Sequence, residues 1–356
     1  MYILIAIALL AILIVVHEMG HFWTARMTGI PISEFAVGMG PKIFGWKSRK
    51  YETTFALRAI PRGGYCAFYG EEDGRGEGKD DPRNFGKQKL WKRMLTILMG
   101  PGMNFLLAFV VATMFFWIGG VNVATGVDPY IAEVMGAGAA HSAGLKAGDV
   151  ITEINGRSML DGTVDTLTNT IAAWQEGDAP LKAIVKRGEE TLEVEMTPTW
   201  DAEAEKMRVG IMVGGKYRVE TEKVGLGGAI DASWQLCVNA AGAILGALRD
   251  LVTTGKGLDQ TSGPVGIVSM VSTEVQQGGF SAFVQLLVLI SINLGLMNLL
   301  PIPGLDGSRL VFGLVELIRR KPVPPEKEAM VHMAGMVLLF GLLIVVTFRD
   351  VIRIFH

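Results

Sequence analysis

The sequence predicts a polytopic α-helical membrane protein with about four transmembrane helices and a folded α+β domain inserted between the second and the third. Half of the 356 residues are hydrophobic and only 19% are charged. The mean hydropathy is +0.37, which is apolar for a protein surrounded by water alone. The apolar residues gather in runs at 1–24, 94–118, 280–300 and 333–348. At about 1.5 Å per residue, each run crosses all or most of the ~30 Å hydrocarbon core, so the lipid bilayer is an expected partner.

Composition also excludes several classes of function. The 33 Lys and Arg residues against 35 Asp and Glu residues leave a net charge of -2, without the general positive field on which nucleic-acid binding depends. We therefore expect no nucleic-acid partner. The two cysteines, Cys66 and Cys237, lie in no CxxC motif or Cys/His cluster, which excludes a disulfide scaffold and a thiolate metal site.

The first run, 1–24, is interpreted as a retained membrane span. A cleaved secretory signal is the alternative, but the run has no basic segment before it and no A-x-A cleavage site. It also continues directly into the polar pair His17-Glu18. We therefore expect this segment to stay attached to the protein.

Lysine and arginine residues beside the runs predict the orientation, because short basic flanks stay on the cytoplasmic side. Six of them crowd into residues 79–93, and none follows the second run until Lys146. This places residues 25–93 inside, with the N-terminus and residues 119–279 outside. Five basic residues follow the third run and agree: Arg309, Arg319, Arg320, Lys321 and Lys327. Arg349 and Arg353 after the fourth run favour the opposite orientation. The charges at the three other span boundaries outweigh them.

The cytoplasmic segment 25–93 contains two β-rich stretches, Thr53–Ile60 and Tyr65–Tyr69, on either side of Pro61-Arg62-Gly63-Gly64. A β-hairpin on the cytoplasmic side is the expected structure. Residues 71–81 are charged and glycine-rich and predict a flexible loop. In the second span, 94–118, Asn104 near Pro101 predicts either a locally broken helix or close packing through small residues.

Residues 121–200 carry the pattern of a small α+β domain. A Gly148-Asp149 turn leads into an apolar strand, and an Asn155-Gly156 hairpin turn ends that strand. A helix at 165–174 and alternating strands at 181–185 and 191–196 follow. The whole stretch resembles a PDZ domain of the bacterial protease-associated type, and a generic α+β domain is the alternative.

The remaining elements complete the membrane part. Residues 201–279 are interpreted as a linker, whose amphipathic stretch 229–251 predicts an interfacial or domain-linking helix rather than a fifth span. The third span, 280–306, ends in Leu-Asp-Gly, and a cytoplasmic loop, 307–332, follows it. The fourth span, 333–348, is the shortest.

The chemistry is concentrated in His17-Glu18-Met19-Gly20-His21, an H-E-x-x-H pattern. Residues i and i+4 share one helix face, so both imidazoles can bind one metal, and zinc suits two histidines. The intervening Glu18 is a candidate general base. A glutamate at membrane depth costs roughly 2.5–3.5 kcal/mol unless it has a partner. The alternative is a Glu18 side chain that extends to the membrane interface.

Two histidines leave zinc short of the three protein ligands of catalytic sites. The other histidines, His141, His332 and His356, are poorly placed for this role. Asp306 stands at the end of the third run, and both the first and the third run end on the inner side. It is therefore a candidate third ligand, although an ordinary turn aspartate before Gly307 is the alternative.

With these motifs, the chain resembles the site-2 proteases, a family of intramembrane zinc metalloproteases that includes the bacterial regulator-of-sigma-E proteases. Residues 17–21 match the family's H-E-x-G-H, and residues 298–307 match its N-x-x-P-x-P-x-L-D-G. The resemblance implies that Asp306 is the third zinc ligand and that Asn298, Pro301 and Pro303 shape the substrate cleft. One PDZ-like domain is found, which favours the single-PDZ branch.

The resemblance further implies an endopeptidase of a bacterial inner (plasma) membrane that acts in regulated intramembrane proteolysis. Its expected substrates are single-span membrane proteins already cut outside, such as an anti-sigma factor or a signal-peptide remnant. The β element at 53–69 would hold an unwound substrate by strand addition. The PDZ domain would bind a peptide C-terminus.

Two alternatives belong to other classes of protein. A metal or solute transporter would place polar groups along a pathway, but the four runs form no inverted repeat and contain no second deep ionisable pair. An inactive membrane scaffold that presents its PDZ domain is the other alternative. The intact set of His17, Glu18, His21 and Asp306 argues against it.

Overall fold

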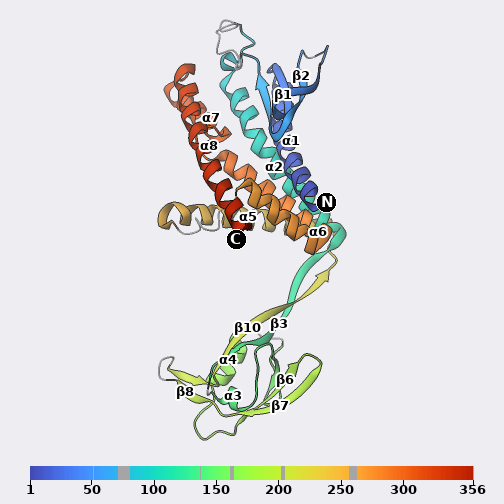
Figure 1. The fold of residues 1–356 in the computed structure, drawn as a ribbon, viewed down its shortest axis with the longest axis vertical. Helices are drawn as coiled ribbons and strands as arrows, with labels where there is room; N and C mark the ends of the chain where they lie inside the picture. Colours follow the sequence, from blue (N-terminus) through green and yellow to red (C-terminus); the bar gives the residue numbers. More distant parts are fainter. Residues whose placement is uncertain are drawn as a thin grey trace. The chain divides into compact units, whose positions relative to one another are not determined.

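A computed structural model of the chain describes residues 1–50, 52–70, 81–136, 138–160, 164–201, 205–255 and 263–355. The chain divides into two compact units (Figure 1). The membrane unit comprises residues 1–118 and 225–356, and the inserted domain comprises residues 119–224. The loop expected at 71–81 lies outside the described residues, apart from Asp81.

The membrane unit is built from long apolar helices, as the composition predicts. Five described helices have the length and apolar composition of a membrane span, so the chain is a multi-pass membrane protein. Their bounds are α1 Tyr2–Thr28, α2 Leu90–Gly119, α5 Leu226–Thr254, α6 Pro264–Leu299 and α8 Pro325–Phe355. The shorter helix α7, Asp306–Arg319, follows α6.

The structure contains one more candidate span than the four expected from the sequence. Helix α5 is the additional one, and it is the least apolar of the five because Asp231 and Arg249 fall within it. Helix α6 starts earlier than expected and has a break at Gly279, where φ is 59° and ψ is -141°. The expected span from residue 280 is the part of α6 after this break.

Small residues bring the helices close together around α1. A Cβ atom at Gly20 of α1 would collide with the backbone carbonyl of Met99 in α2. A Cβ atom at Gly295 of α6 would lie 3.2 Å from the carbonyl oxygen of Pro101 in α2. Helix α2 itself runs unbroken through Pro101, so close packing, rather than a broken helix, is what the structure shows here.

The β element of the membrane unit differs from the expected hairpin. Strand β1 is Ile32–Lys47 and strand β2 is Thr54–Phe68. Residues 32–37 pair with residues 64–68, residues 42–47 pair with residues 54–58, and residues 34–37 also lie beside residues 54–57. The two β-rich stretches of β2 therefore do not form a hairpin with each other, because the first part of β1 lies between them.

The local backbone explains this correction. Ser48 follows β1 and Thr53 precedes β2, and the Ser48 N–H donates to the Thr53 carbonyl at 2.9 Å, which brings the start of β2 back beside the end of β1. The Pro-Arg-Gly-Gly stretch instead continues inside β2, with Gly63 at a φ of 92°. Strand β1 is not predicted from the sequence, because Gly38, Gly40 and Pro41 interrupt its alternation of polar and apolar residues.

The inserted domain has one main sheet with the strand order β10-β3-β4-β6-β7, and β5 pairs with β4. A separate two-stranded sheet joins β8 and β9. The strands are β3 Val121–Val134, β4 Val150–Ile154, β5 Arg157–Ser158, β6 Leu181–Arg187, β7 Glu190–Met196, β8 Thr199–Asp201, β9 Lys206–Arg208 and β10 Ile211–Glu222. The helices are α3 Ala139–Ser142 and α4 Val164–Ala172.

The inserted domain ends later than the boundary expected at residue 200. Strand β10 pairs with β3 from Ile211 opposite Val134 to Glu222 opposite Val121, and the compact unit extends to Val224. The expected Asn155-Gly156 turn is present, with φ of 50° and 79°, the pattern of a type I′ hairpin turn. The core includes fully buried side chains from β3, β4, α4 and β6: Ile131, Ile151, Ile154, Leu167 and Val185.

Candidate metal centre

Helix α1 carries the H-E-x-x-H residues in its second half and presents two buried imidazoles. His17 and His21 are 7% and 6% exposed. Their rings stand nearly perpendicular, with centroids 4.9 Å apart, and their Nε2 atoms lie 3.2 Å from each other. The i, i+4 spacing therefore brings two possible ligand atoms to one point, as the motif predicts.

Asp306 reaches the same point from a different element. It is the first residue of α7, after the connection at residues 300–305 that follows α6. Its Oδ2 atom lies 3.0 Å from His17 Nε2 and 3.2 Å from His21 Nε2. The structure thus brings together the three residues expected as metal ligands, although they are up to 289 positions apart in the chain.

The donor set fits a zinc ion. The Nδ1 atom of His21 donates to the Thr96 carbonyl oxygen at 2.9 Å, so Nε2 carries the free lone pair. Within the described part of the chain, buried Asp306 Oδ2 has no hydrogen-bond partner and faces only the two imidazole nitrogens. Ligand atoms about 2.0–2.1 Å from a tetrahedral zinc lie roughly 3.3 Å apart. The observed spacing of 3.0–3.2 Å is close to this value.

A polar residue on α2 completes the environment of His17. The Nδ2 atom of Asn104 lies 3.3 Å from His17 Nδ1, while Asn104 Oδ1 is buried and has no partner among the described residues. A histidine that binds metal through Nε2 carries its proton on Nδ1. An amide turned to present Oδ1 to this proton would satisfy both groups. From the sequence, Asn104 is expected only to accompany a helix break or close packing in the second span, not to contact a histidine.

Close packing of α2 against α1 is a condition of this geometry. A Cβ atom at Gly100 would collide with the His21 ring. Sequence reasoning missed this function of Gly100, because the contact joins two helices that are about 80 residues apart and no motif encodes it.

Glu18 faces a cavity of about 270 Å³ beside the three candidate ligands. Its side chain is half-buried and accepts a hydrogen bond from the backbone N–H of Cys66 in β2. A Cβ atom at Gly64 would lie 3.2 Å from Glu18 Cγ. The last part of β2 therefore lies directly along the candidate general base, and it has a strand partner on one side only among the described residues.

The predicted substrate-cleft residues divide into two groups. Asn298 lines the cavity together with Phe68, Ile97 and Arg309. Pro301 and Pro303 are not among the lining residues of the described chain. Pro303 instead packs against Gly335 of α8, where a Cβ atom would collide with the proline.

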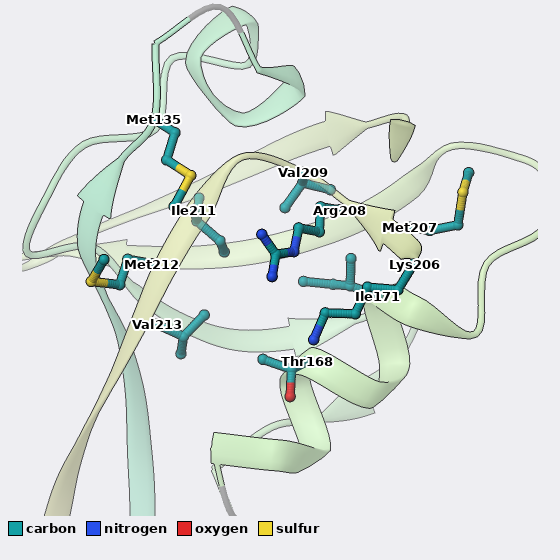
Figure 2. A pocket seen from close by; sticks show the side chains of 10 residues that line it. All are labelled: Met135, Thr168, Ile171, Lys206, Met207, Arg208, Val209, Ile211, Met212 and Val213. Carbon is teal, nitrogen blue, oxygen red and sulfur yellow. The ribbon is translucent and has the colours of Figure 1, made fainter. Parts of the chain in front are cut away.

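The inserted domain has a second cavity, of about 290 Å³, between α4 and the strands β9 and β10 (Figure 2). Thr168 and Ile171 from α4 face Ile211 and Val213 from β10 across it. Lys206 and Arg208 of β9 add positive charge, and Arg208 Nη1 pairs with Asp201 Oδ2 at 2.9 Å. The cavity is largely apolar with cationic groups beside it.

Comparisons with known proteins identify a family and relatives of this chain. A family model described as "Peptidase family M50" matches residues 5–342. The chain is 33% identical to "Regulator of sigma-W protease RasP" of Bacillus subtilis, over 96% of each chain. It is 30% identical to "Zinc metalloprotease RasP" of Bacillus licheniformis, over 96% of this chain and 97% of the relative.

Among solved structures, the chain is similar to the PDZ domain of an SdrC-like protein from Listeria monocytogenes. The identity is 25%, and the similarity covers 26% of this chain and 90% of that one, with a TM-score of 0.22.

Proposed function

Because the chain belongs to peptidase family M50, we propose that His17, Glu18, His21 and Asp306 are the active site with which it cuts transmembrane segments. The protein is a zinc-dependent intramembrane endopeptidase that acts in regulated intramembrane proteolysis. The convergence of two imidazole nitrogens and one carboxylate oxygen within 3.2 Å carries the assignment.

Each residue has a defined task in this site. His17 Nε2, His21 Nε2 and Asp306 Oδ2 hold the zinc. A zinc ion held by these three atoms would supply Lewis-acid chemistry toward water and the scissile carbonyl. The Glu18 carboxylate takes the proton of the attacking water and returns it to the leaving amide nitrogen. Thr96 and Asn104 fix the orientations of the two imidazoles.

The substrate must lose its helix before cleavage, since helical hydrogen bonds hide the scissile carbonyl. Residues 64–68 of β2 offer a strand edge next to Glu18 on which an unwound peptide can bind by strand addition. Asn298 lines the same cavity, and its amide can donate to a peptide carbonyl. Pro301 and Pro303 act by shaping the connection that leads to Asp306, rather than by touching the substrate.

The topology we propose places the N-terminus and the inserted domain outside a bacterial inner membrane, with residues 25–93 inside. Helix α5 then lies in the outer interface and does not span. If α5 crossed the membrane, the end of α6 would reach the outer leaflet, whereas Asp306 at that end lies 3.0 Å from His17. Figure 1 shows α5 lying crosswise to α2 and α8, which supports this placement.

The inserted domain is, we infer, a PDZ domain that restricts the substrates. Its cavity between α4 and β10 suits an apolar peptide C-terminus, and its bulk hinders a substrate that still carries an outer domain. Substrates of this kind are single-span proteins shortened outside, such as anti-sigma factors or signal-peptide remnants. The name of the Bacillus subtilis relative, "Regulator of sigma-W protease RasP", supports the first of these.

The test compares cleavage of one tagged single-span substrate in trimmed and untrimmed forms. The intact enzyme should cut only the trimmed form, and Glu18→Gln should cut neither. Replacement of residues 119–224 by a flexible linker should allow cleavage of both forms at unchanged zinc content. Equal loss of both activities in the deletion variant would show that the domain serves docking or folding and does not exclude substrates.

A further inference from the structure

The position of Asp306 depends on the short connection at residues 300–305 between α6 and α7. Its own backbone hydrogen bonds are local, from Ile302 N–H to the Leu300 carbonyl at 2.7 Å and from Leu305 N–H to the Ile302 carbonyl at 3.1 Å. These bonds shape the connection but attach it to no other element. Something else must hold it where Asp306 meets the two histidines.

One face of α8 supports this connection. A Cβ atom at Gly335 would collide with Pro303, so the two backbones are in direct contact. Gly304, with a φ of 98°, is also close, since its ideal Cβ position lies 3.3 Å from both Met336 and Leu339 side chains. Residues 335, 336 and 339 of α8 therefore pack against the turn that precedes Asp306.

His332 lies one helical turn before Met336 on the same helix and adds a directional contact. The Gly304 N–H donates to His332 Nδ1 at 3.1 Å. Because Nδ1 accepts this bond, the ring proton is on Nε2. The Nε2 atom is buried and has no hydrogen-bond partner among the described residues. Glu328 Oε1 lies 3.7 Å away, so its negative charge is on the side of the ring that carries the proton.

We propose that His332 is a positioning residue of the metal site. Its Nδ1 atom fixes the Gly304 backbone to α8, and this attachment sets the distance of the Asp306 carboxylate from His17 and His21. The inference rests on the proposed function, in which Asp306 is a zinc ligand. His332 itself is not a ligand, since its ring is committed to Gly304 and faces Glu328.

Substitutions at this one position separate the two ring nitrogens. Asparagine places a carbonyl oxygen where Nδ1 stands, whereas glutamine places its amide group near Nε2 and supplies no acceptor at the Nδ1 position. His332→Asn should therefore restore what His332→Ala loses, and His332→Gln should not. Met333→Ala is the matched control on α8, because Met333 is the residue next to His332 and is 60% exposed.

The measurement is zinc affinity of the full chain in detergent, by competition with a chelator, together with kcat and KM on a model span. We expect His332→Ala and His332→Gln to bind zinc roughly tenfold more weakly and to lose kcat more than they change KM. His332→Asn and Met333→Ala should stay within about twofold of the unchanged enzyme.

Two results would overturn the proposal. One is a zinc affinity of His332→Ala equal to that of the parent chain. The other is equal weakening by alanine and asparagine with a lower thermal midpoint of the metal-free protein, which would indicate a general packing role. If the parent chain itself held no zinc, the proposed function would fail, independently of His332.

Discussion

At the scale of single residues, the metal site is defined by the second nitrogen of each histidine as much as by the ligand atoms. His21 Nδ1 is bound by the Thr96 carbonyl and His17 Nδ1 faces Asn104. Both contacts orient Nε2 toward Asp306. The Thr96 carbonyl places the proton of His21 on Nδ1, and the Asn104 amide restrains the His17 ring, so contacts with α2 orient both imidazoles of the proposed site.

Replacement of Asn104 tests this orientation. Asn104→Leu removes the partner of His17 Nδ1 and should weaken zinc binding roughly tenfold, as measured by competition with a chelator. Thr113→Ala, also on α2, is the control, because Thr113 Oγ1 donates to the Phe109 carbonyl of its own helix. Unchanged zinc affinity in Asn104→Leu would mean that His17 needs no orienting partner.

Gly100 provides a steric test at the same scale. Gly100→Ala would force a methyl group into the His21 ring, and overpacking of this kind costs about 1–3 kcal/mol. We expect displaced His21, loss of most cleavage activity and weaker zinc binding. Gly102→Ala is the matched control, since its nearest neighbour outside the local backbone is Met99 Sδ at 3.4 Å, an ordinary contact. Equal activities of the two variants would contradict this account of the α1–α2 packing.

The sequence predicts the four residues of the proposed site but not their surroundings. The i, i+4 spacing of His17 and His21 and the position of Asp306 at the end of the third apolar run are visible without a structure. Asn104 and Gly100 contribute through contacts between α1 and α2, and such contacts depend on how the two helices pack. No periodicity within either helix encodes them.

At the scale of elements, local pattern predicted the helices better than the pairing of strands. The sequence predicts β-rich stretches at Thr53–Ile60 and Tyr65–Tyr69, yet the strand that contains them, β2, pairs with the glycine-interrupted strand β1. Likewise, the position of β10 in the sheet depends on its partner β3, which is distant in sequence. Alternation reveals that a segment is a strand, but register depends on which neighbour covers it.

An ion pair in the inserted domain predicts a pH dependence. Buried Asp149 accepts two hydrogen bonds from Arg187, at 2.8 and 2.7 Å, and these bonds lower the pKa of the Asp149 carboxyl. A carboxyl whose folded pKa lies below its unfolded value stabilises the fold above that unfolded value, about 3.9. The stabilisation is lost as the pH falls through the folded pKa.

Arg187→Leu should therefore destabilise the domain at neutral pH and make its stability less dependent on pH below about 5. Hydrogen exchange of the amides in β4, measured in the full chain, reports this stability. Lys182→Leu is the control on the same strand, because the Lys182–Glu195 pair is well exposed and contributes little. Identical pH profiles for parent and Arg187→Leu would contradict the role of the pair.

At the scale of the whole molecule, the site restricts the topology. His17 and Asp306 can meet only if the C-terminal ends of α1 and α6 lie in the same leaflet, and the basic residues at 79–93 indicate the inner one. If α5 lies at the outer interface, the four remaining spans place the C-terminal ends of α1 and α6 together in the inner leaflet. The charge pattern of the sequence predicts this orientation. The end of the inserted domain at Val224 could be located only from the structure, through the β3–β10 pairing.

Single cysteines test this arrangement after Cys66 and Cys237 have been replaced by serine. Lys87→Cys should react with an impermeant thiol reagent only from the cytoplasmic side, and Glu189→Cys in the inserted domain only from outside. Thr253→Cys, at the end of α5, should react from outside. Labelling of Thr253→Cys from the cytoplasmic side would mean that α5 spans the membrane.

The zinc content of two variants tests the central claim most directly. Asp306→Ala and Glu18→Gln are purified in detergent and compared with the parent chain, which should hold about one zinc ion. We predict that Glu18→Gln retains zinc but cuts no substrate, because Glu18 is the base and not a ligand. Asp306→Ala should lose both zinc and activity, since two histidines leave the site incomplete. Full zinc occupancy of Asp306→Ala at unchanged affinity would contradict the three-ligand site.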